Sequence, residues 1–194
     1  MPLTRSHLRK LGAVTLGLLG AAWLGGLWSF ASADGHFEAT LPRRHPPPPA
    51  RHNFSQWDQG PTVRASSYFG DWLGHHHPLF VVDGRTQPDL AEKWASAEHD
   101  RHPWLEIRWR EPHDLERVVL RHAGSLESPA LTVRRYTVAC LVAAGVGPRV
   151  DVDDNEAAVA IHDLDCRQAL GVHIAFAPNG GDIVRLYEVE TWGR

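Results

Sequence analysis

The residues best suited to chemistry gather between Val63 and Ser96. A loop rich in aromatic rings and histidines follows a short apolar run, and an acidic turn at Asp83-Gly84 comes shortly before Trp94. An acidic turn beside a buried tryptophan indicates a loop folded around an ion or a tight hydrogen-bond network. Clustered aromatic and imidazole rings indicate a ligand-binding surface. This stretch alone leaves both interpretations open.

Three consecutive histidines, His75 to His77, lie within the aromatic loop. Imidazole nitrogens bind Zn²⁺ and Ni²⁺ readily. Adjacent side chains of an extended segment point to opposite sides, however, so three in a row rarely share one ion. We therefore interpret the run as part of a solvated loop.

Patterns of catalysis do not accompany this stretch. The chain has no G-x-S-x-G nucleophile elbow and no Gly-rich phosphate loop. The acidic run from Asp151 to Asp154 resembles the start of a calcium-binding loop, but the glycine and the final glutamate of that motif do not follow. The formal net charge of −3 gives no electrostatic case for nucleic acid. We expect a protein that is not an enzyme and has no nucleic-acid partner.

The N-terminus has the features of a targeting segment. Arg5, Arg9 and Lys10 precede an uncharged run from Leu11 to Ala31, and Ala31-Ser32-Ala33 fits an A-x-A cleavage site. Residues 1–33 are therefore predicted to be a signal peptide, or an uncleaved signal anchor, because an apolar run of about 20 residues can span a bilayer. In either case the remainder is secreted or extracytoplasmic, in the second case membrane-anchored through this segment.

The exported part contains two cysteines, Cys140 and Cys166. An even count in an oxidising compartment favours one disulfide between them. Two buried free thiols are the alternative.

Residues 34–60 are predicted to be a Pro-rich linker, because the run Pro46 to Pro49 cannot form a helix or a central strand. From about Pro61 to Arg194 the sequence consists of short β-rich runs that alternate with clusters of Gly, Pro, Asp and Asn. The predicted strands are Val63–Ser67, Leu79–Val82, Trp104–Trp109, Leu115–His122, Val133–Val142, Val150–Val152, Ala157–His162, Leu170–Phe176 and Val184–Trp192.

Several of these strands alternate apolar and polar residues, as half-buried antiparallel strands do. Leu105, Ile107 and Trp109 share one face, with Glu106 and Arg108 on the other. Many short strands of this kind predict an all-β protein, a sandwich or a barrel.

An ordered series of motifs over residues 62–194 resembles a known family. The series includes Ala65-Ser66-Ser67, Val82-Asp83-Gly84, Lys93-Trp94-Ala95-Ser96, Trp104-Leu105-Glu106-Ile107 and the closing run Val184 to Glu190. Together they are similar to the discoidin domain (coagulation factor 5/8 type C) of the galactose-binding-like superfamily, which many bacterial carbohydrate-binding modules share. The resemblance implies an antiparallel jelly-roll β-sandwich. This sequence departs from the family in its cysteines, which lie in the middle of the domain, whereas the family's common disulfide joins the two ends.

The resemblance also implies a structural calcium ion. Its ligands here would be Asp83, Asp89 and Glu188, with backbone carbonyls of the loop over residues 80–91. Calcium prefers several oxygen ligands and tolerates irregular geometry. The alternative is that Glu188 pairs with an arginine or with backbone donors and binds no metal.

The resemblance further places a ligand site on the loops at one end of the sandwich, where aromatic rings contact a sugar and planar polar groups bind its hydroxyls. The candidate residues are Tyr68, Phe69, Trp72, His75, His122, Glu127, Arg134 and Asn155. An ordinary surface ion pair between Glu127 and Arg134 is the alternative.

We therefore expect a non-catalytic binding module with a glycan as its ligand. The alternative is an adhesion or structural module of the cell envelope that binds protein or lipid head groups, with Phe69 and Trp72 as apolar anchors.

Overall fold

The computed structural model describes residues 51–70, 75–88, 92–178 and 182–194, all within one compact unit. The predicted signal segment and most of the predicted linker lie outside these ranges. No helix in the described ranges is long and apolar enough to cross a membrane. The strands are β1 (His52–Asn53), β2 (Thr62–Ala65), β3 (Trp94–Ala95), β4 (Trp104–His122), β5 (Arg135–Val142), β6 (Gly145–Val152), β7 (Val159–Ala177) and β8 (Arg185–Gly193).

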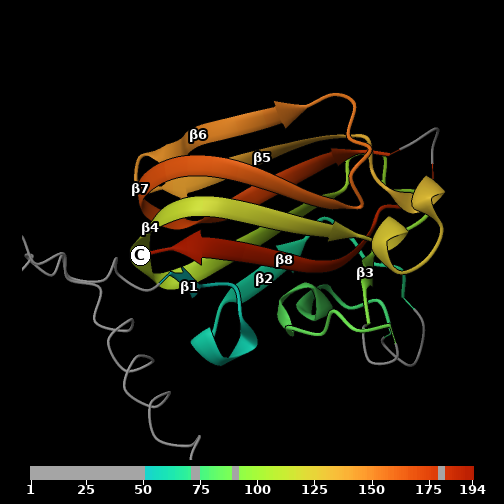
Figure 1. The fold of residues 1–194 in the computed structure, drawn as a ribbon, viewed down its shortest axis with the longest axis horizontal. Coiled ribbons are helices and arrows are strands. Elements are labelled where there is room, and N and C mark those ends of the chain that lie inside the picture. Colours follow the sequence, from blue (N-terminus) through green and yellow to red (C-terminus); the bar gives the residue numbers. More distant parts are fainter. Residues whose placement is uncertain (1–50, 71–74, 89–91, 179–181) are drawn as a thin grey trace, which may run out of the picture. The chain divides into compact units, whose positions relative to one another are not determined.

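All strand pairs are antiparallel, and the hydrogen-bonded order is β1-β8-β4-β7-β5-β6, with β2 on β4 and β3 on β8. β4 and β7 each contain 19 residues, and each bends in the middle (Figure 1). The bends divide the strands into two layers. The β8 layer contains β1, β3, β8, the second half of β4 and the first half of β7. The β5 layer contains β2, the first half of β4, the second half of β7, β5 and β6. This is the predicted all-β antiparallel sandwich.

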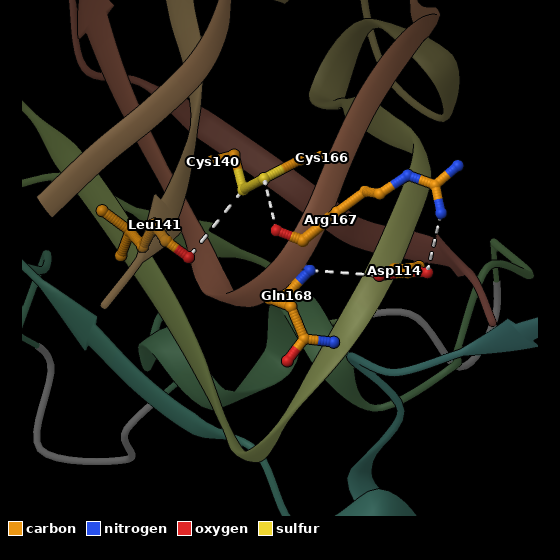
Figure 2. Close-up of a disulfide and its surroundings, with 6 residues drawn as sticks. All are labelled: Asp114, Cys140, Leu141, Cys166, Arg167 and Gln168. Carbon is orange, nitrogen blue, oxygen red and sulfur yellow. Dashed lines mark hydrogen bonds and ion pairs between the residues drawn. A yellow bond between two sulfur atoms is a disulfide. The ribbon is translucent and has the colours of Figure 1, made fainter. Parts of the chain in front are cut away.

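The bends occur where the ladder between β4 and β7 loses its register, between Arg108 and Arg117. Pro112 lies in this part of β4 and has no amide proton to donate to the ladder. On β7, Gln168 has a φ of 55°, and its N–H donates to Asp114 Oδ1 at 3.1 Å (Figure 2). Arg167 forms an ion pair with the same carboxylate at 3.7 Å. Asp114 therefore connects the two bends.

A disulfide between Cys140 and Cys166 connects β5 to β7 beside this bend (Figure 2). The two Cα atoms are 6.5 Å apart, and 26 positions separate the residues in sequence. The sequence prediction of this disulfide is confirmed. In the chain-entropy account, closing such a loop stabilises the fold by about 3–4 kcal/mol.

The core fills the space between the layers. Leu105 and Ile107 are fully buried and Trp109 nearly so, which confirms the alternation predicted for β4. Trp94 and Ile174 are also fully buried. Neighbouring outward positions of β4 are only partly buried or exposed.

Some predicted boundaries were wrong. Leu79–Val82 is not a strand but most of a 3-10 helix, η2 (Pro78–Val82). Pro78 stands at its first position, where its fixed φ suits a helical turn, and His77 Nδ1 accepts a hydrogen bond from the Leu79 N–H at 3.2 Å. Val81 and Val82 are still fully buried in the core. The apolar run therefore correctly indicated burial, but it did not indicate a strand. The paired strands predicted over Trp104–His122 are one continuous strand, β4.

The domain also begins before residue 61. β1 pairs with the end of β8, and Phe54 is 5% exposed and stacks on His113 with ring centroids 4.0 Å apart. Asn53 Oδ1 accepts hydrogen bonds from the N–H groups of Ser55 and Thr191 at 3.2 and 2.8 Å. The predicted linker over 34–60 therefore includes residues that belong to the folded domain.

Candidate functional site

One end of the sandwich combines several loops and strand ends. η3 (Ala123–Ser125) and η4 (Pro129–Leu131) follow β4 there, and β3 pairs with the start of β8 at the same end (Figure 1). We refer to this region as the loop end. It contains a polar cluster around Glu127, one of the predicted ligand-binding residues.

Glu127 is the centre of this cluster. Its Oε1 accepts hydrogen bonds from Lys93 Nζ at 2.5 Å and from the Tyr187 hydroxyl at 2.9 Å. The Lys93 ammonium also lies 5.6 Å from the centre of the Tyr187 ring. Both hydrogen bonds end on Oε1, so Oε2 has no partner in the described part of the chain.

The electrostatics favour an ionised Glu127. Its partial burial opposes ionisation, but the bonds from Lys93 and Tyr187 and the charges of Lys93 and Arg185 outweigh burial and lower its pKa. Burial, followed by the bond to Glu127, raises the pKa of Tyr187 to about 12. The cluster thus presents a carboxylate beside an ammonium and a neutral phenol over the ordinary pH range.

The aromatic segment over residues 67–69 runs beside this cluster. The Trp94 indole N–H donates to the Ser67 carbonyl at 2.9 Å, and the Phe69 N–H donates to the Ala95 carbonyl at 2.7 Å. Ala95 in turn pairs with Arg185 of β8. Tyr68 is 47% exposed, whereas Phe69 is partly buried, with its ring 5.6 Å from that of His76. Within the described residues of this segment, Tyr68 therefore has the more exposed aromatic ring.

His122 does not belong to the surface, contrary to the sequence prediction. It is fully buried with its ring 5.4 Å from that of Tyr136. Burial, and to a lesser degree the charge of His162, lowers its pKa to about 4. A ligand at the surface cannot reach this ring, so His122 is a neutral core residue.

Asn155 is likewise a structural residue and not a ligand contact. It is 8% exposed, and its side-chain N–H₂ donates to the carbonyls of Val133 and Ala157 at 3.0 Å each. It also lies 3.4 Å from His122 Nε2. Both side chains are polar, but the fold buries both of them.

Arg134 is exposed, but it forms ion pairs with Asp154 at 2.5 Å and Glu156 at 3.4 Å. These partners hold it on the loop between β6 and β7. His75 is also exposed. Trp72 and Asp89 lie outside the described residues.

The predicted cation site brings two carboxylates together across 105 positions of sequence. Glu188 is 1% exposed, and its Oε2 accepts a hydrogen bond from the Gly84 N–H at 3.3 Å. Its Oε1 is buried and has no hydrogen-bond partner among the described residues. Burial, and then the charge of Asp83, raises the pKa of Glu188 to about 9. Burial also raises the pKa of Asp83 despite the bond from the Arg85 N–H.

An orphaned buried carboxylate oxygen beside a second carboxylate fits a divalent cation. Within the described ranges no three His, Cys, Asp or Glu side chains form a metal-binding group. From the described residues, a cation here would therefore take its remaining ligands from backbone carbonyls, which calcium accepts.

Lys93, Arg185 and Tyr187 were missed by the sequence prediction. Lys93 belongs to the Lys-Trp-Ala-Ser motif and Tyr187 to the closing strand, where both were considered only as parts of the scaffold. The pairing of β3 with β8 brings them together.

A cavity of about 340 Å³ lies away from this cluster and is lined by Arg51, Glu116, Arg117, Asp163, Asp165 and Arg194. Its arginines are bound by its own acids: Arg51 and Arg194 by Glu116, and Arg117 by Asp163. The lining thus contains three arginines and three acids, and each arginine has an acidic partner within it.

No protein-family profile and no curated protein matches this sequence. Solved structures do match. A chitosan-binding module from a chitosanase/glucanase of Paenibacillus sp. IK-5 has a TM-score of 0.58 at 20% identity, covering 73% of this chain and 99% of that module. The family 32 carbohydrate-binding module of Streptococcus pneumoniae EndoD has a TM-score of 0.57 at 18% identity, covering 74% and 100%.

The lectin domain of lectinolysin, solved with Lewis B antigen, has a TM-score of 0.59 at 16% identity, covering 74% of this chain and 97% of that domain. At sequence identities this low, the structural similarity establishes that the fold is shared and nothing more. The chain shares the antiparallel β-sandwich fold of these carbohydrate-binding modules, which is the fold that the sequence resemblance predicted.

Proposed function

We propose that this domain is a non-catalytic glycan-binding module whose ligand site is the Glu127 cluster with Tyr68. The observation that carries the proposal is the arrangement of Glu127, Lys93 and Tyr187, a set of preformed acceptors and donors at the loop end. The segment over residues 67–69, which carries the exposed Tyr68, is hydrogen-bonded to Trp94 and Ala95, which follow Lys93 in sequence. The fold is shared with modules described as binding chitosan, fucose and Lewis B antigen.

The chemistry of the cluster suits a sugar hydroxyl. The free Oε2 of Glu127 can accept a hydrogen bond, and the Lys93 ammonium has donors beyond the one that it gives to Glu127. The Tyr68 ring offers an apolar face to the C–H groups of a pyranose. Because Lys93 and Tyr187 already hold Glu127, binding costs little side-chain entropy.

The test is a glycan-array screen followed by titration of any bound glycan. Glu127→Gln keeps the shape of the side chain and removes its charge, and we expect about tenfold weaker binding. Tyr68→Ala should weaken binding by a similar factor. Glu111→Gln is the matched control, because Glu111 is an exposed acid at the bend of β4. Glycan binding that survives both loop-end substitutions would refute the proposed site.

We also propose a structural calcium ion at Asp83 and Glu188. Calcium would neutralise the two facing carboxylates and hold the turn after η2 against β8. The orphaned Oε1 of Glu188 and the raised pKa of both acids support this role. Asp89 remains a candidate third ligand.

Export is the third proposal. A basic N-terminus, an uncharged run and the Ala31-Ser32-Ala33 site support a segment that directs the domain out of the cytoplasm. The disulfide suits an oxidising compartment. Mass spectrometry of the mature N-terminus would distinguish cleavage after Ala33 from a retained anchor, and protein confined to the cytoplasm would exclude both.

A further inference from the structure

The outer face of the β5 layer carries an aromatic and charged patch that the proposed function does not use. On β4, Trp104, Glu106 and Arg108 alternate with fully buried Leu105 and Ile107, so they point away from the core. Arg64 on β2 and His173 on β7 also lie on this side, opposite inward neighbours. We call Arg64, Trp104, Glu106, Arg108 and His173 the Trp104 face.

The strand register brings these side chains into one group. Glu106 pairs across the sheet with Arg64 on one side and with His173 on the other. The rings of Trp104 and His173 are tilted by 33°, with centroids 5.4 Å apart. The group therefore forms a continuous surface across three adjacent strands, and not a set of scattered residues.

The next positions along the sheet are small. Trp104 pairs with Ala175, and His173 pairs with Ala139 of β5. The methyl groups of these alanines are too short to cover the rings of Trp104 and His173. The partly exposed Trp104 is thus flanked by the small, exposed Ala175, which leaves room beside the indole for a sugar ring, whereas Ala139 is buried.

The charges of the face do not cancel. Arg108 is bound by Glu106 at 2.8 Å, and on β6 Arg149 is bound by Asp151 at 3.1 Å. Arg64 is exposed and forms no close ion pair in the described ranges, although its charge is one of those that lower the pKa of Glu106 opposite it. The face therefore holds two guanidiniums and one carboxylate beside an indole, on a chain whose formal net charge is −3.

We propose that the Trp104 face is a second carbohydrate-binding surface, which binds acidic polysaccharide, with Arg64 on a sugar carboxylate and Trp104 against the neighbouring pyranose ring. A guanidinium fork matches the geometry of a carboxylate, and a tryptophan contributes apolar contact to the C–H face of a sugar. This pair of groups, positive and aromatic, distinguishes a uronic-acid polymer from a neutral one. The surface lies on the strands and uses no residue of the Glu127 cluster.

The experiment compares two forms of one polymer with the full-length protein. Polygalacturonate carries a carboxylate on each ring, and its methyl ester has the same chain without the charge. We expect binding of polygalacturonate in isothermal titration, and binding of the methyl ester at least about tenfold weaker. Arg64→Gln should weaken polygalacturonate binding about tenfold and leave binding of the ester unchanged.

Arg167→Gln is the matched control, because the Arg167 side chain is 80% exposed at the bend of β7, away from this face. It removes the same charge and should leave binding unchanged. Equal losses in Arg64→Gln and Arg167→Gln would mean non-specific attraction and would overturn the proposal. So would the absence of polygalacturonate binding, or full binding by Arg64→Gln.

Trp104→Leu tests the aromatic contact, with a thermal melt to show that the variant is folded. It should weaken binding of both polymer forms, because both forms lose the ring contact. Glu127→Gln should leave polygalacturonate binding unchanged. Loss of that binding in Glu127→Gln but not in Arg64→Gln would place the polymer at the loop end and refute this second surface while leaving the first proposal intact.

Discussion

The buried carboxyl group of Glu188 makes the stability of the domain depend on pH. Its pKa is raised to about 9 by burial and by Asp83, while the ordinary value of the unfolded chain is 4.5. The folded state therefore holds a proton that the unfolded state releases. Without a cation, the free energy of unfolding should decrease as pH rises from about 4.5 to about 9.

We predict that Glu188→Gln stabilises the metal-free protein at about pH 8, by on the order of a few kcal/mol, because glutamine needs no proton. In millimolar calcium the sign should reverse, since the variant lacks a carboxylate ligand. Thermal midpoints with chelator and with calcium measure both effects. If calcium does not change the thermal midpoint of the unsubstituted protein, the proposed calcium ion is wrong, whatever the pH dependence.

His122 is a second buried group with a measurable pH effect, of opposite sign. The unfolded chain binds a proton at the ordinary value of 6.5, whereas the folded chain does not do so until about pH 4. The unfolded state is thus favoured as pH falls through this window. The effect of His122 is complete below about pH 4.

We predict that His122→Leu flattens the acid side of the stability profile. Relative to the variant, the unsubstituted protein should lose on the order of 3 kcal/mol between about pH 7 and pH 4. Denaturant titrations at several pH values give the difference, and the contribution of Glu188 is common to both proteins. Parallel profiles would contradict a buried neutral imidazole.

At the scale of elements, the bends of β4 and β7 depend on close backbone contacts. Asp114 and Arg194 exchange two backbone hydrogen bonds, of 2.8 and 2.9 Å, where β8 ends. A Cβ on Gly193 would lie 1.9 Å from the Asp114 carbonyl oxygen. The glycine at this position is required by packing and not by a special φ.

We predict that Gly193→Ala destabilises the domain by at least about 2 kcal/mol, because backbone must move to admit the methyl group. Gly147→Ala is the control, since the nearest atom to its added Cβ is a Val142 methyl at 3.4 Å. Urea unfolding of both variants measures the difference. Equal stabilities would show that β8 can shift without cost.

At the scale of the whole molecule, the N-terminal boundary of the domain decides whether it folds well. Phe54 fills a place in the core, and Ser55 Oγ donates to the Val189 carbonyl at 2.6 Å. These contacts join the start of the domain to its last strand. A boundary at residue 61 removes them.

We predict that a fragment of residues 61–194 melts about 10 °C or more below a fragment of residues 49–194, because it loses one large core side chain and the β1 pairing. Thermal unfolding of the two fragments measures this. Residues 49–60 carry only two charged side chains, so a change in net charge does not explain the loss. Matching midpoints would place the boundary at residue 61 after all.

The sequence by itself determined the strands and their inward faces. Alternation such as Leu105, Ile107 and Trp109 is a local signal, because successive side chains of a strand point to opposite sides. The ordered motifs predicted the fold through their resemblance to a known family, and the same resemblance implied that Asp83 and Glu188 lie together. The apolar run at Pro78–Val82 could not distinguish a strand from a 3-10 helix, because a buried segment of either kind is apolar.

The tertiary structure decided which polar residues reach the surface. His122 and Asn155 look like ligand contacts by type, yet the packing of β4 against Tyr136 places them inside. Lys93 and Tyr187 look like scaffold, yet the pairing of β3 with β8 places them on Glu127. The physical reason is that exposure and partners depend on contacts between residues far apart in sequence, which no local pattern encodes.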